Sequence, residues 1–238
     1  MGGDGVATSH VEIMAVRAVP DGDEYDKDVA LAIRYAVDNG AKVINGSFGK
    51  YYSPHSQWVY DALKYAGEKD VLVVFAAGNE GIDLDADKSE RYPNDDKNTL
   101  DEYTNNVLTI GALSYNYGED LVADFSNYGK TKVDVFSPGV RIYATVPNDK
   151  YEFLQGTSMA SPNAAGVAAL VRAYYPKLKA AEVKQIIMKS GIAIPQEVIL
   201  GGDENTTRQF KETCRSGKIV NAYNAIILAD KVSRGEKL

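Results

Sequence analysis

Apolar residues in this chain form two patterns, short continuous runs and stripes at helical spacing. The continuous runs, which predict strands, lie at residues 11–19, 42–45, 71–76, 107–111, 134–136 and 140–146. The helical stripes lie at residues 28–37, 59–66, 158–175, 181–190 and 221–232. Because strands and helices alternate in the first half of the chain, we predict an α/β fold whose central sheet is mostly parallel.

Two polar stretches contrast with one strongly apolar helix. Residues 83–105 are rich in aspartate and residues 201–216 are polar, so both are predicted to be exposed loops. In the helix predicted at residues 158–175, nearly every residue is apolar or small. A helix that is apolar on all sides needs neighbours all round, so we expect it in the core.

Composition places the chain among ordinary globular proteins. Of its 238 residues, 45% are hydrophobic and 25% charged, enough for one sizeable core, and we predict a single domain over residues 1–238. The formal net charge of −7 argues against nucleic acid as a partner. No apolar run approaches the length of a membrane span, and the single cysteine, Cys214, excludes an internal disulfide.

A tight turn, Gly156-Thr157-Ser158, leads directly into the apolar helix. We predict that Thr157 is the N-cap residue and that Ser158 lies at the helix N-terminus. The dipole and the free backbone N–H groups of a helix N-terminus favour developing negative charge, which suits a nucleophile. Taken alone, Ser158 is equally well explained as a capping serine.

The residues from Gly156 to Pro162 resemble the nucleophile motif of the subtilisin-like serine proteases, Gly-Thr-Ser-Met-Ala-x-Pro. Other segments are similar to motifs of that family and follow in the family's order: Asn45-Gly46-Ser47-Phe48-Gly49, Ala76-Ala77-Gly78-Asn79-Glu80-Gly81, Phe125-Ser126-Asn127-Tyr128-Gly129 and Ser137-Pro138-Gly139-Val140. The resemblance extends from about residue 5 to about residue 229. It implies the fold of that family, which has three layers with the mostly parallel sheet between helices.

The resemblance implies a role for each motif. Ser158 is the nucleophile, and the side chain of Asn79 donates a hydrogen bond to the oxyanion together with the backbone N–H of Ser158. The segment that pairs with the substrate as an added strand is Ser47, Phe48 and Gly49. One wall of the specificity pocket is Ala76, Ala77 and Gly78. The substrates are peptides or proteins, and no cofactor is required. From the residues alone, Asn79 also fits an Asx turn and the glycines fit ordinary turns.

The base that would activate Ser158 is not marked by a family motif in this sequence, and His10 and His55 are weak candidates for it. The family carries its aspartate in an Asp-[Ser/Thr]-Gly motif and its histidine in a His-Gly-Thr-His motif, and neither occurs here. The two histidines, His10 and His55, lie outside any such motif. We therefore expect the domain to be incomplete at its N-terminus, with the aspartate and histidine before Met1, and the chain alone to be inactive. The alternative is a non-catalytic module of the same fold that binds peptides.

The sequence also bears on metal, location and partners. Asp83-x-Asp85-x-Asp87 has the oxygen spacing of a calcium loop but lacks the turn glycine and the closing glutamate, so a solvated loop is favoured; calcium stays an alternative because family members often bind it. Exported family members imply an extracytoplasmic location. Without an upstream segment, the helix after Ser158 is expected to expose an apolar patch and the sheet an unpaired edge. The chain would then bind that segment in trans or self-associate.

Three residues depart from the family's pattern. Gly46 stands where the family usually has a larger apolar residue, Phe75 stands directly before Ala76-Ala77, and Ser137 replaces the usual alanine before Pro138. We expect the local packing to differ at these positions.

Overall fold

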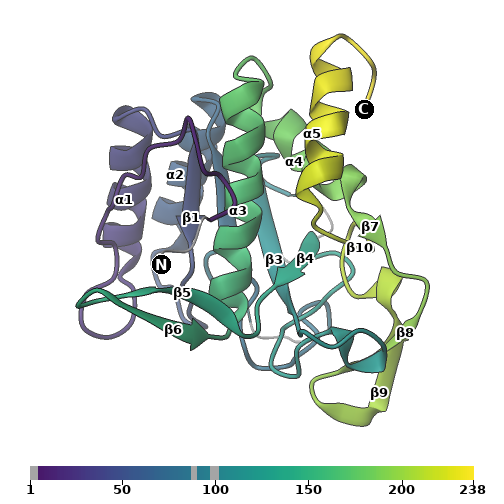
Figure 1. Cartoon of the computed structure of the whole chain (residues 1–238). Helices are drawn as coiled ribbons and strands as arrows, with labels where there is room; N and C mark the ends of the chain where they lie inside the picture. The colour runs from purple at the N-terminus through teal and green to yellow at the C-terminus, as the bar shows by residue number, and fades with distance from the viewer. Residues whose placement is uncertain (1–4, 87–89, 97–101) are drawn as a thin grey trace.

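The computed structural model describes residues 5–86, 90–96 and 102–238, with a six-stranded sheet at its centre (Figure 1). The strands lie in the order β1-β2-β3-β4-β10-β7. Their bounds are β1 Val43–Gly46, β2 Leu72–Ala76, β3 Val107–Leu113, β4 Val135–Pro138, β7 Ile192–Ala193 and β10 Lys218–Ile219. Neighbouring strands are parallel except for β10 with β7, which confirms the predicted α/β fold with a mostly parallel sheet.

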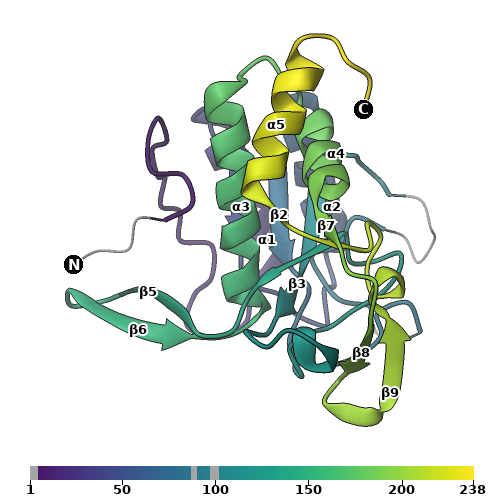
Figure 2. The same cartoon turned by 45° about the vertical axis from the view of Figure 1, so that its right-hand side comes forward.

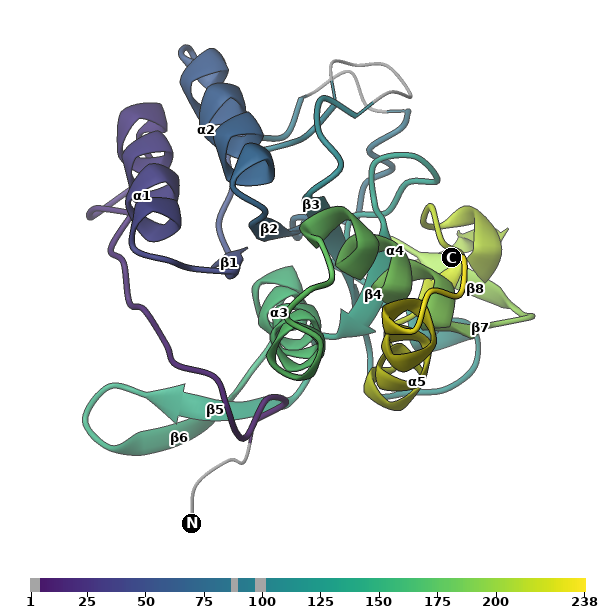
Figure 3. The same cartoon turned by 90° about the horizontal axis from the view of Figure 1, so that it is seen from above.

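Helices cover both faces of this sheet, so the fold has three layers (Figure 3). One face carries α1 (Asp26–Asp38) and α2 (Ser56–Glu68). The other carries α3 (Thr157–Tyr174), α4 (Ala180–Ser190) and α5 (Ala222–Ser233). Alternation along β2 explains the division, because Val73 and Phe75 pack with α1 and α2 while Leu72 and Val74 pack with α3 and α4. A strand between two helical layers must therefore be apolar at every position, as β2 is.

Local signals set the ends of several helices. The Glu182 carboxylate accepts a hydrogen bond of 2.7 Å from the backbone N–H of Lys179, and Gly191 follows the last residue of α4. The Asn221 side chain caps α5 by accepting a hydrogen bond of 2.8 Å from the N–H of Asn224. Within the described residues, no helix combines the length and the apolar character that crossing a bilayer requires.

Two antiparallel hairpins lie outside the central sheet. β5 (Ile142–Val146) and β6 (Lys150–Leu154) form the first, which projects from the body of the protein (Figures 1 and 2). β8 (Glu197–Leu200) and β9 (Asp203–Gln209) form the second. The prediction of a loop at residues 201–216 is therefore wrong for the residues of β9. Its side chains are polar and mostly exposed, so no apolar alternation marked it as a strand. Short 3₁₀ turns lie at Glu119–Leu121 and Phe210–Glu212.

The strand predicted at residues 11–19 is also wrong. This segment pairs with no strand of the described part of the chain, and Figure 2 shows it in purple, apart from the sheet. The side chain of Ile13 is 94% exposed, and Val11, Met14 and Val16 are exposed as well. The apolar run predicted burial, but a strand forms only where a neighbouring strand supplies hydrogen-bond partners.

The apolar patch expected on the helix after Ser158 is largely covered. Ala160, Ala164, Ala168 and Val171 are fully buried in the core beneath the sheet. The N-terminal segment covers another part of α3, since a Cβ atom placed on Gly166 would lie 2.8 Å from the Cβ of Val6. β1 does lie at an edge of the sheet, where an unpaired strand edge was expected.

Two of the departures from the family pattern, Gly46 and Phe75, compensate for each other. β1 and β2 are adjacent and in register, with Gly46 opposite Phe75. A Cβ atom on Gly46 would lie 2.5 Å from the Phe75 ring, so the ring fills the space that a larger residue at position 46 would need. The missing side chain at Gly46 and the large ring at Phe75 thus balance in volume, so the space between the two neighbouring strands stays filled.

We expect the chain in solution to bind a hydrophobic dye and to self-associate, because apolar side chains are exposed along residues 11–16 and on the β5–β6 hairpin. Replacing Ile13 by Asp should lower both the dye fluorescence and the light scattering. The melting temperature should hardly move, because substitution of an exposed residue usually changes stability by about 0.5 kcal/mol or less.

Ala15→Asp is the matched control, since it adds the same charge to the same exposed segment without removing a large apolar side chain. A chain that is monomeric and binds no dye before any substitution contradicts the prediction.

Candidate functional site

The predicted site residues meet at the N-terminus of α3. Gly156 is the N-cap residue, with a φ of 142° that favours glycine, and Thr157 is the first residue of the helix. The prediction that Thr157 caps the helix is therefore wrong. Its buried hydroxyl is directed to the end of β2, where it accepts a hydrogen bond of 3.1 Å from the N–H of Gly78. Ser158 follows in the first helical turn and is half-buried.

Ser158 and Ser47 are joined by two reciprocal hydrogen bonds. The Ser158 hydroxyl donates to the carbonyl of Ser47 at 3.1 Å, and the Ser47 hydroxyl donates to the carbonyl of Ser158 at 2.8 Å. Asn45 strengthens the contact, because its Nδ2 donates to Ser47 Oγ at 2.9 Å and its Oδ1 accepts from Ser161 Oγ at 2.7 Å. The predicted nucleophile and the predicted substrate segment are thus held against each other, 111 positions apart in sequence.

Asn79 lies on the other side of the same helix N-terminus. Its Oδ1 accepts hydrogen bonds from the backbone N–H of Thr157 at 2.8 Å and from the Thr157 hydroxyl at 2.9 Å. The amide is therefore oriented by its oxygen. Asn79 is an exposed residue, and its Nδ2 would lie 3.6 Å from a Cβ atom placed on Gly156. The backbone N–H of Ser158 belongs to the first helical turn, whose N–H groups lack intrahelical acceptors.

The segment after β1 is also braced on the side away from Ser158. Lys50 and Tyr92 form an antiparallel bridge with N–H to carbonyl distances of 2.9 and 2.8 Å, and Arg91 Nη2 donates to the carbonyl of Phe48 at 3.1 Å. Successive carbonyl groups of an extended chain point to opposite sides. The carbonyl of Phe48 therefore faces Arg91, while that of Ser47 faces the Ser158 side.

Side chains pack against the end of the wall predicted from Ala76, Ala77 and Gly78. Ala76 and Ala77 are buried. A Cβ atom on Gly78 would meet Asn127 Nδ2 at 2.4 Å, Glu80 Oε2 at 2.7 Å and Arg91 Nε at 3.0 Å, so side chains fill the space.

These filling side chains form a polar group of their own. The Glu80 carboxylate accepts hydrogen bonds from the Tyr51 hydroxyl and from Asn127 Nδ2. Burial and the hydrogen bond to Glu80 raise the pKa of Tyr51 to about 12, and burial lowers the pKa of Arg91 to about 10. Both side chains nevertheless keep their ordinary protonation state at neutral pH, so Arg91 is a buried cation behind the substrate segment.

The described part of the chain shows no hydrogen bond between either histidine and Ser158. The ring of His10 shares a hydrogen bond of 3.0 Å with Ser9 and packs against Tyr174. His55 stacks on Trp58, with ring centroids 4.3 Å apart. The helix N-terminus therefore brings together the predicted nucleophile and the predicted oxyanion donors, while both imidazoles have other partners.

The acidic stretch considered for calcium has protein partners at two of its three carboxylates. Asp83 forms an ion pair of 2.7 Å with Arg208. Asp85 accepts hydrogen bonds from the backbone N–H groups of Thr131 and Lys132 and from the Thr131 hydroxyl. Asp87 lies outside the described residues. Among the described residues, no group of three potential ligands is arranged to hold a metal ion.

Sequence reasoning missed three residues that build this site. Asn45 and Ser161 couple the substrate segment to α3, and Arg91 braces its rear edge. Asn45 directly precedes Gly46-Ser47 in a matched motif and could have been singled out. Arg91 had no such signal, because it lies within the polar stretch that predicted a loop.

Comparison with known proteins connects these features to one family. The family model described as the subtilase family matches residues 2–217. A thermophilic serine proteinase of Bacillus sp. (strain AK1) is 40% identical over 163 residues, which cover 68% of this chain and 36% of that protein. Thermitase of Thermoactinomyces vulgaris is 38% identical over 160 residues, 67% of this chain and 50% of that protein. The chain spans half or less of these relatives.

Solved structures show the same fold. The prenylagaramide maturation protease PagA matches with a TM-score of 0.68 and 26% identity, covering 89% of this chain and 71% of that one. The self-cleaved protease domain of PatA matches with a TM-score of 0.63 and 26% identity, covering 90% of this chain and 70% of that one.

Proposed function

Because this chain belongs to the subtilase family, a family of subtilisin-like serine proteases, we propose that it is a serine endopeptidase that cleaves peptide bonds through Ser158. The observation that carries the proposal is the meeting of three separate motifs at the N-terminus of α3. Ser47 contacts Ser158 directly, and Asn79 is bonded to Thr157, the residue before it. The proposed reaction requires no cofactor.

In the proposed reaction, Ser158 Oγ attacks the carbonyl carbon of the substrate and the carbonyl oxygen becomes an oxyanion. Asn79 Nδ2 and the backbone N–H of Ser158 are the proposed donors to that oxyanion, supported by the dipole of α3. The hydrogen bonds that fix Asn79 Oδ1 orient the amide before the substrate arrives. Such preorganisation stabilises the transition state more than the substrate.

The substrate is proposed to bind as an added strand beside Ser47–Gly49. The rear of this segment is occupied by Arg91 and Tyr92, which leaves the edge on the Ser158 side for main-chain hydrogen bonds to a peptide. Gly49 makes room for this brace, because a Cβ atom there would lie 2.5 Å from Arg91 Nη2. The substrates on this proposal are peptides or proteins in extended conformation.

A second candidate is a non-catalytic module that binds peptides at the same segment. It is favoured by the hydrogen bond from the Ser158 hydroxyl to the Ser47 carbonyl, together with the other partners of His10 and His55. The two candidates differ in one respect, which is whether Ser158 adds to a carbonyl group.

A peptide aldehyde tests that difference on this chain without turnover. Ser158 Oγ would bond to the aldehyde carbon, and the hydroxyl proton would end on the former carbonyl oxygen to give a hemiacetal. We expect the aldehyde to bind about 10²-fold more tightly than the matching peptide alcohol, because it resembles the transition state. Isothermal titration of both compounds measures the ratio.

Ser158→Ala is the control, and it should bind the aldehyde and the alcohol equally. Equal binding by the unsubstituted chain identifies the non-catalytic module. Failure of both compounds to bind removes the proposed peptide site. N-methylation of alternate peptide nitrogens should abolish binding in all forms, because an added strand needs those N–H groups.

The relatives also support a proposal on location. One of them, 39% identical over 194 residues, is a cell wall-associated protease of Bacillus subtilis (strain 168). We infer an extracytoplasmic location for this chain, and a segment bound in trans or a second copy as its partner at the exposed residues 11–16. Calcium stays an alternative ligand of the acidic stretch.

A further inference from the structure

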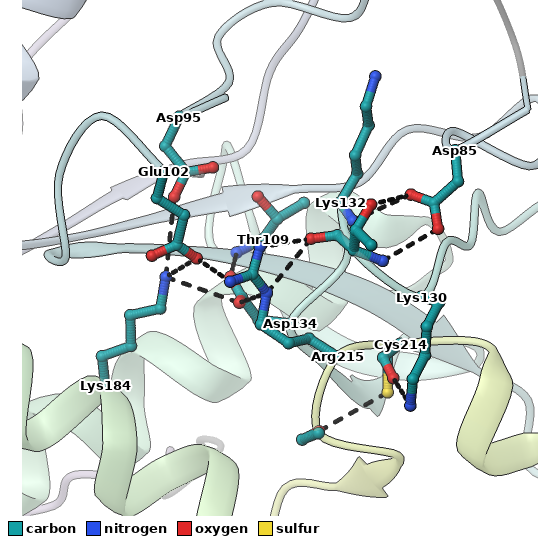
Figure 4. Close-up of polar contacts among 12 residues, drawn as sticks. Asp85, Asp95, Glu102, Thr109, Lys130, Lys132, Asp134, Lys184, Cys214 and Arg215 are labelled. Atoms are coloured by element: carbon teal, nitrogen blue, oxygen red, sulfur yellow. Dashed lines mark hydrogen bonds and ion pairs between the residues drawn. The ribbon is translucent and has the colours of Figure 1, made fainter. Parts of the chain in front are cut away.

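A buried group of charges lies next to the segment that braces the proposed peptide site. It consists of Asp95, Glu102, Asp134, Lys184 and Arg215, here called the charge cluster (Figure 4). Lys184 on α4 is 1% exposed, and its Nζ lies 2.7 Å from Glu102 Oε1, 3.6 Å from Asp134 Oδ1 and 3.7 Å from Asp95 Oδ2. Arg215 lies 3.0 Å from Glu102 Oε1 and 3.6 Å from Asp134 Oδ1.

Counted over the described residues alone, the charge cluster is one positive charge short. Three carboxylates face two cations, and the next pair outward, Asp96 with Lys132 at 3.9 Å, is itself neutral. Asp134 Oδ2 accepts a hydrogen bond of 2.8 Å from the N–H of Thr109. Its Oδ1, like Asp95 Oδ2, has no hydrogen-bond donor among the described residues. An uncompensated charge in a buried position is costly, so the cluster favours holding one proton.

Asp95 is the carboxyl group best placed to hold that proton at neutral pH. Burial raises its pKa to about 7, and the neighbouring carboxylates Asp134, Glu102 and Asp96 add to the rise while Lys184 opposes it. Burial also raises the pKa of Asp134. The carboxylates together outweigh the effect of burial on Lys184 and raise its pKa, so its ammonium stays charged.

A short piece of chain connects Asp95 to the proposed peptide site. Residues Arg91–Asp96, here called the strap, begin at the rear edge of the substrate segment, where Arg91 donates to the Phe48 carbonyl and Tyr92 pairs with Lys50. Near the other end of the strap lies Asp95. Its carbonyl accepts a hydrogen bond of 2.6 Å from the N–H of Tyr103, and its carboxylate lies in the charge cluster. A change in the protonation of Asp95 therefore occurs only four residues along the chain from Arg91.

Space for such a change exists beside the carboxylate. A cavity of about 20 Å³, lined by polar side chains that include Arg91, Asp95 and Lys132, lies along the strap. That volume is about what one water molecule needs. An ionised Asp95 can therefore gain solvation by a small movement of the strap.

We propose that Asp95 is a positioning residue for the peptide-binding segment: when it loses its proton, the strap loosens, Ser47–Lys50 becomes less ordered and peptides bind less tightly. The assignment of Ser47–Lys50 to peptide binding rests on the proposed function. The direction of the pH dependence follows from the direction in which the pKa of Asp95 is shifted. Asp95 binds its proton more tightly in the folded protein than in the unfolded chain, so its contribution to order is greatest at low pH. That contribution is lost as the pH rises through about 7.

Hydrogen exchange of the full chain and of Asp95→Asn tests the proposal. Asparagine keeps the shape of the side chain but cannot ionise. At about pH 6 the two proteins should exchange residues 46–52 and 90–96 at equal rates. At about pH 8, one unit above the pKa, the unsubstituted chain should exchange both segments about tenfold faster than Asp95→Asn. Comparison at the same pH removes the intrinsic pH dependence of exchange.

Asp70→Asn is the matched control, because Asp70 also contacts α4, through the N–H of Ala180 at 2.6 Å, and pairs with Arg172 Nη2 of α3 at 3.1 Å, and among the described residues it forms no hydrogen bond or ion pair with the strap. It should leave the exchange of both segments unchanged at either pH. The affinity of the peptide alcohol should fall about tenfold between the same two pH values for the unsubstituted chain and stay constant for Asp95→Asn.

The outcomes separate this proposal from the proposed function. Equal exchange of the two proteins at about pH 8 overturns the role of Asp95, whether or not peptides bind. A change confined to residues 90–96 also overturns it, because the cluster then stabilises only its own loop. If both segments respond as expected but no peptide binds, Asp95 positions Ser47–Lys50 and the proposed function fails.

Discussion

The chain by itself is expected to hydrolyse a peptide anilide no faster than its Ser158→Ala variant. The reason lies in the contacts of Ser158, whose hydroxyl donates to the Ser47 carbonyl while His10 and His55 have other partners. Without a base, the hydroxyl is a weak nucleophile. Loss of the base costs about 10⁶ in kcat in subtilisin, a member of this same family, from which the size of the effect is taken.

Imidazole added to the solution can act as the general base that we expect the chain to lack. In the presence of imidazole, the unsubstituted chain should gain turnover and Ser158→Ala should not. Release of the anilide chromophore measures both. Turnover without imidazole that depends on Ser158 contradicts the prediction and identifies a base within this chain.

Replacing Asn79 is expected to lower turnover strongly in any form of the protein that is active, including the form supplied with imidazole. Asn79→Ala removes the proposed oxyanion donor, and the contact strengthens only as charge develops, so kcat should fall far more than KM changes. The loss of about 10²–10³ in kcat is the value for the corresponding donor in subtilisin, a relative of this chain.

A second variant separates the donor from the structural role of the same side chain. Asn79→Asp keeps an oxygen to accept the two hydrogen bonds from Thr157 but removes the amide donor. It should lose as much turnover as Asn79→Ala while keeping the melting temperature. Asn116→Ala, at an exposed asparagine after β3, is the control for asparagine replacement in general. A rise in KM with kcat unchanged would make Asn79 a binding or structural residue.

The order and type of most elements could be predicted because the responsible signals are local. The unbroken apolar run at β2 and the helical stripes of α1, α2 and α4 depend on residues a few positions apart. Prediction failed where a partner decided the outcome. The apolar run at residues 11–19 has no neighbouring strand among the described residues, and the polar strand β9 forms because β8 lies beside it.

The candidate site likewise has features that local sequence predicts and features that depend on residues far apart in the chain. The nucleophile motif and the Asn79 motif could be recognised in the sequence, and the structure brings both to one helix N-terminus. The hydroxyl of Thr157 was assigned to the wrong role, because a capping residue is recognised by sequence position while its actual partner, Gly78, lies 79 positions away. The pocket wall at Ala76, Ala77 and Gly78 stays a prediction, and side chains of Asn127, Glu80 and Arg91 lie in the space beside Gly78.

The sequence by itself determined the family, the alternation of strands and helices, and the identity of Ser158 as the candidate nucleophile. Only the tertiary structure decided which residues support that serine: Asn45 and Ser161 beside it, Arg91 behind the substrate segment, and the charge cluster around Lys184. The physical reason is that burial and hydrogen bonding are settled between residues far apart in the chain. From the sequence alone, Lys184 is expected to be a solvated side chain. In the structure, three carboxylates from other segments enclose it.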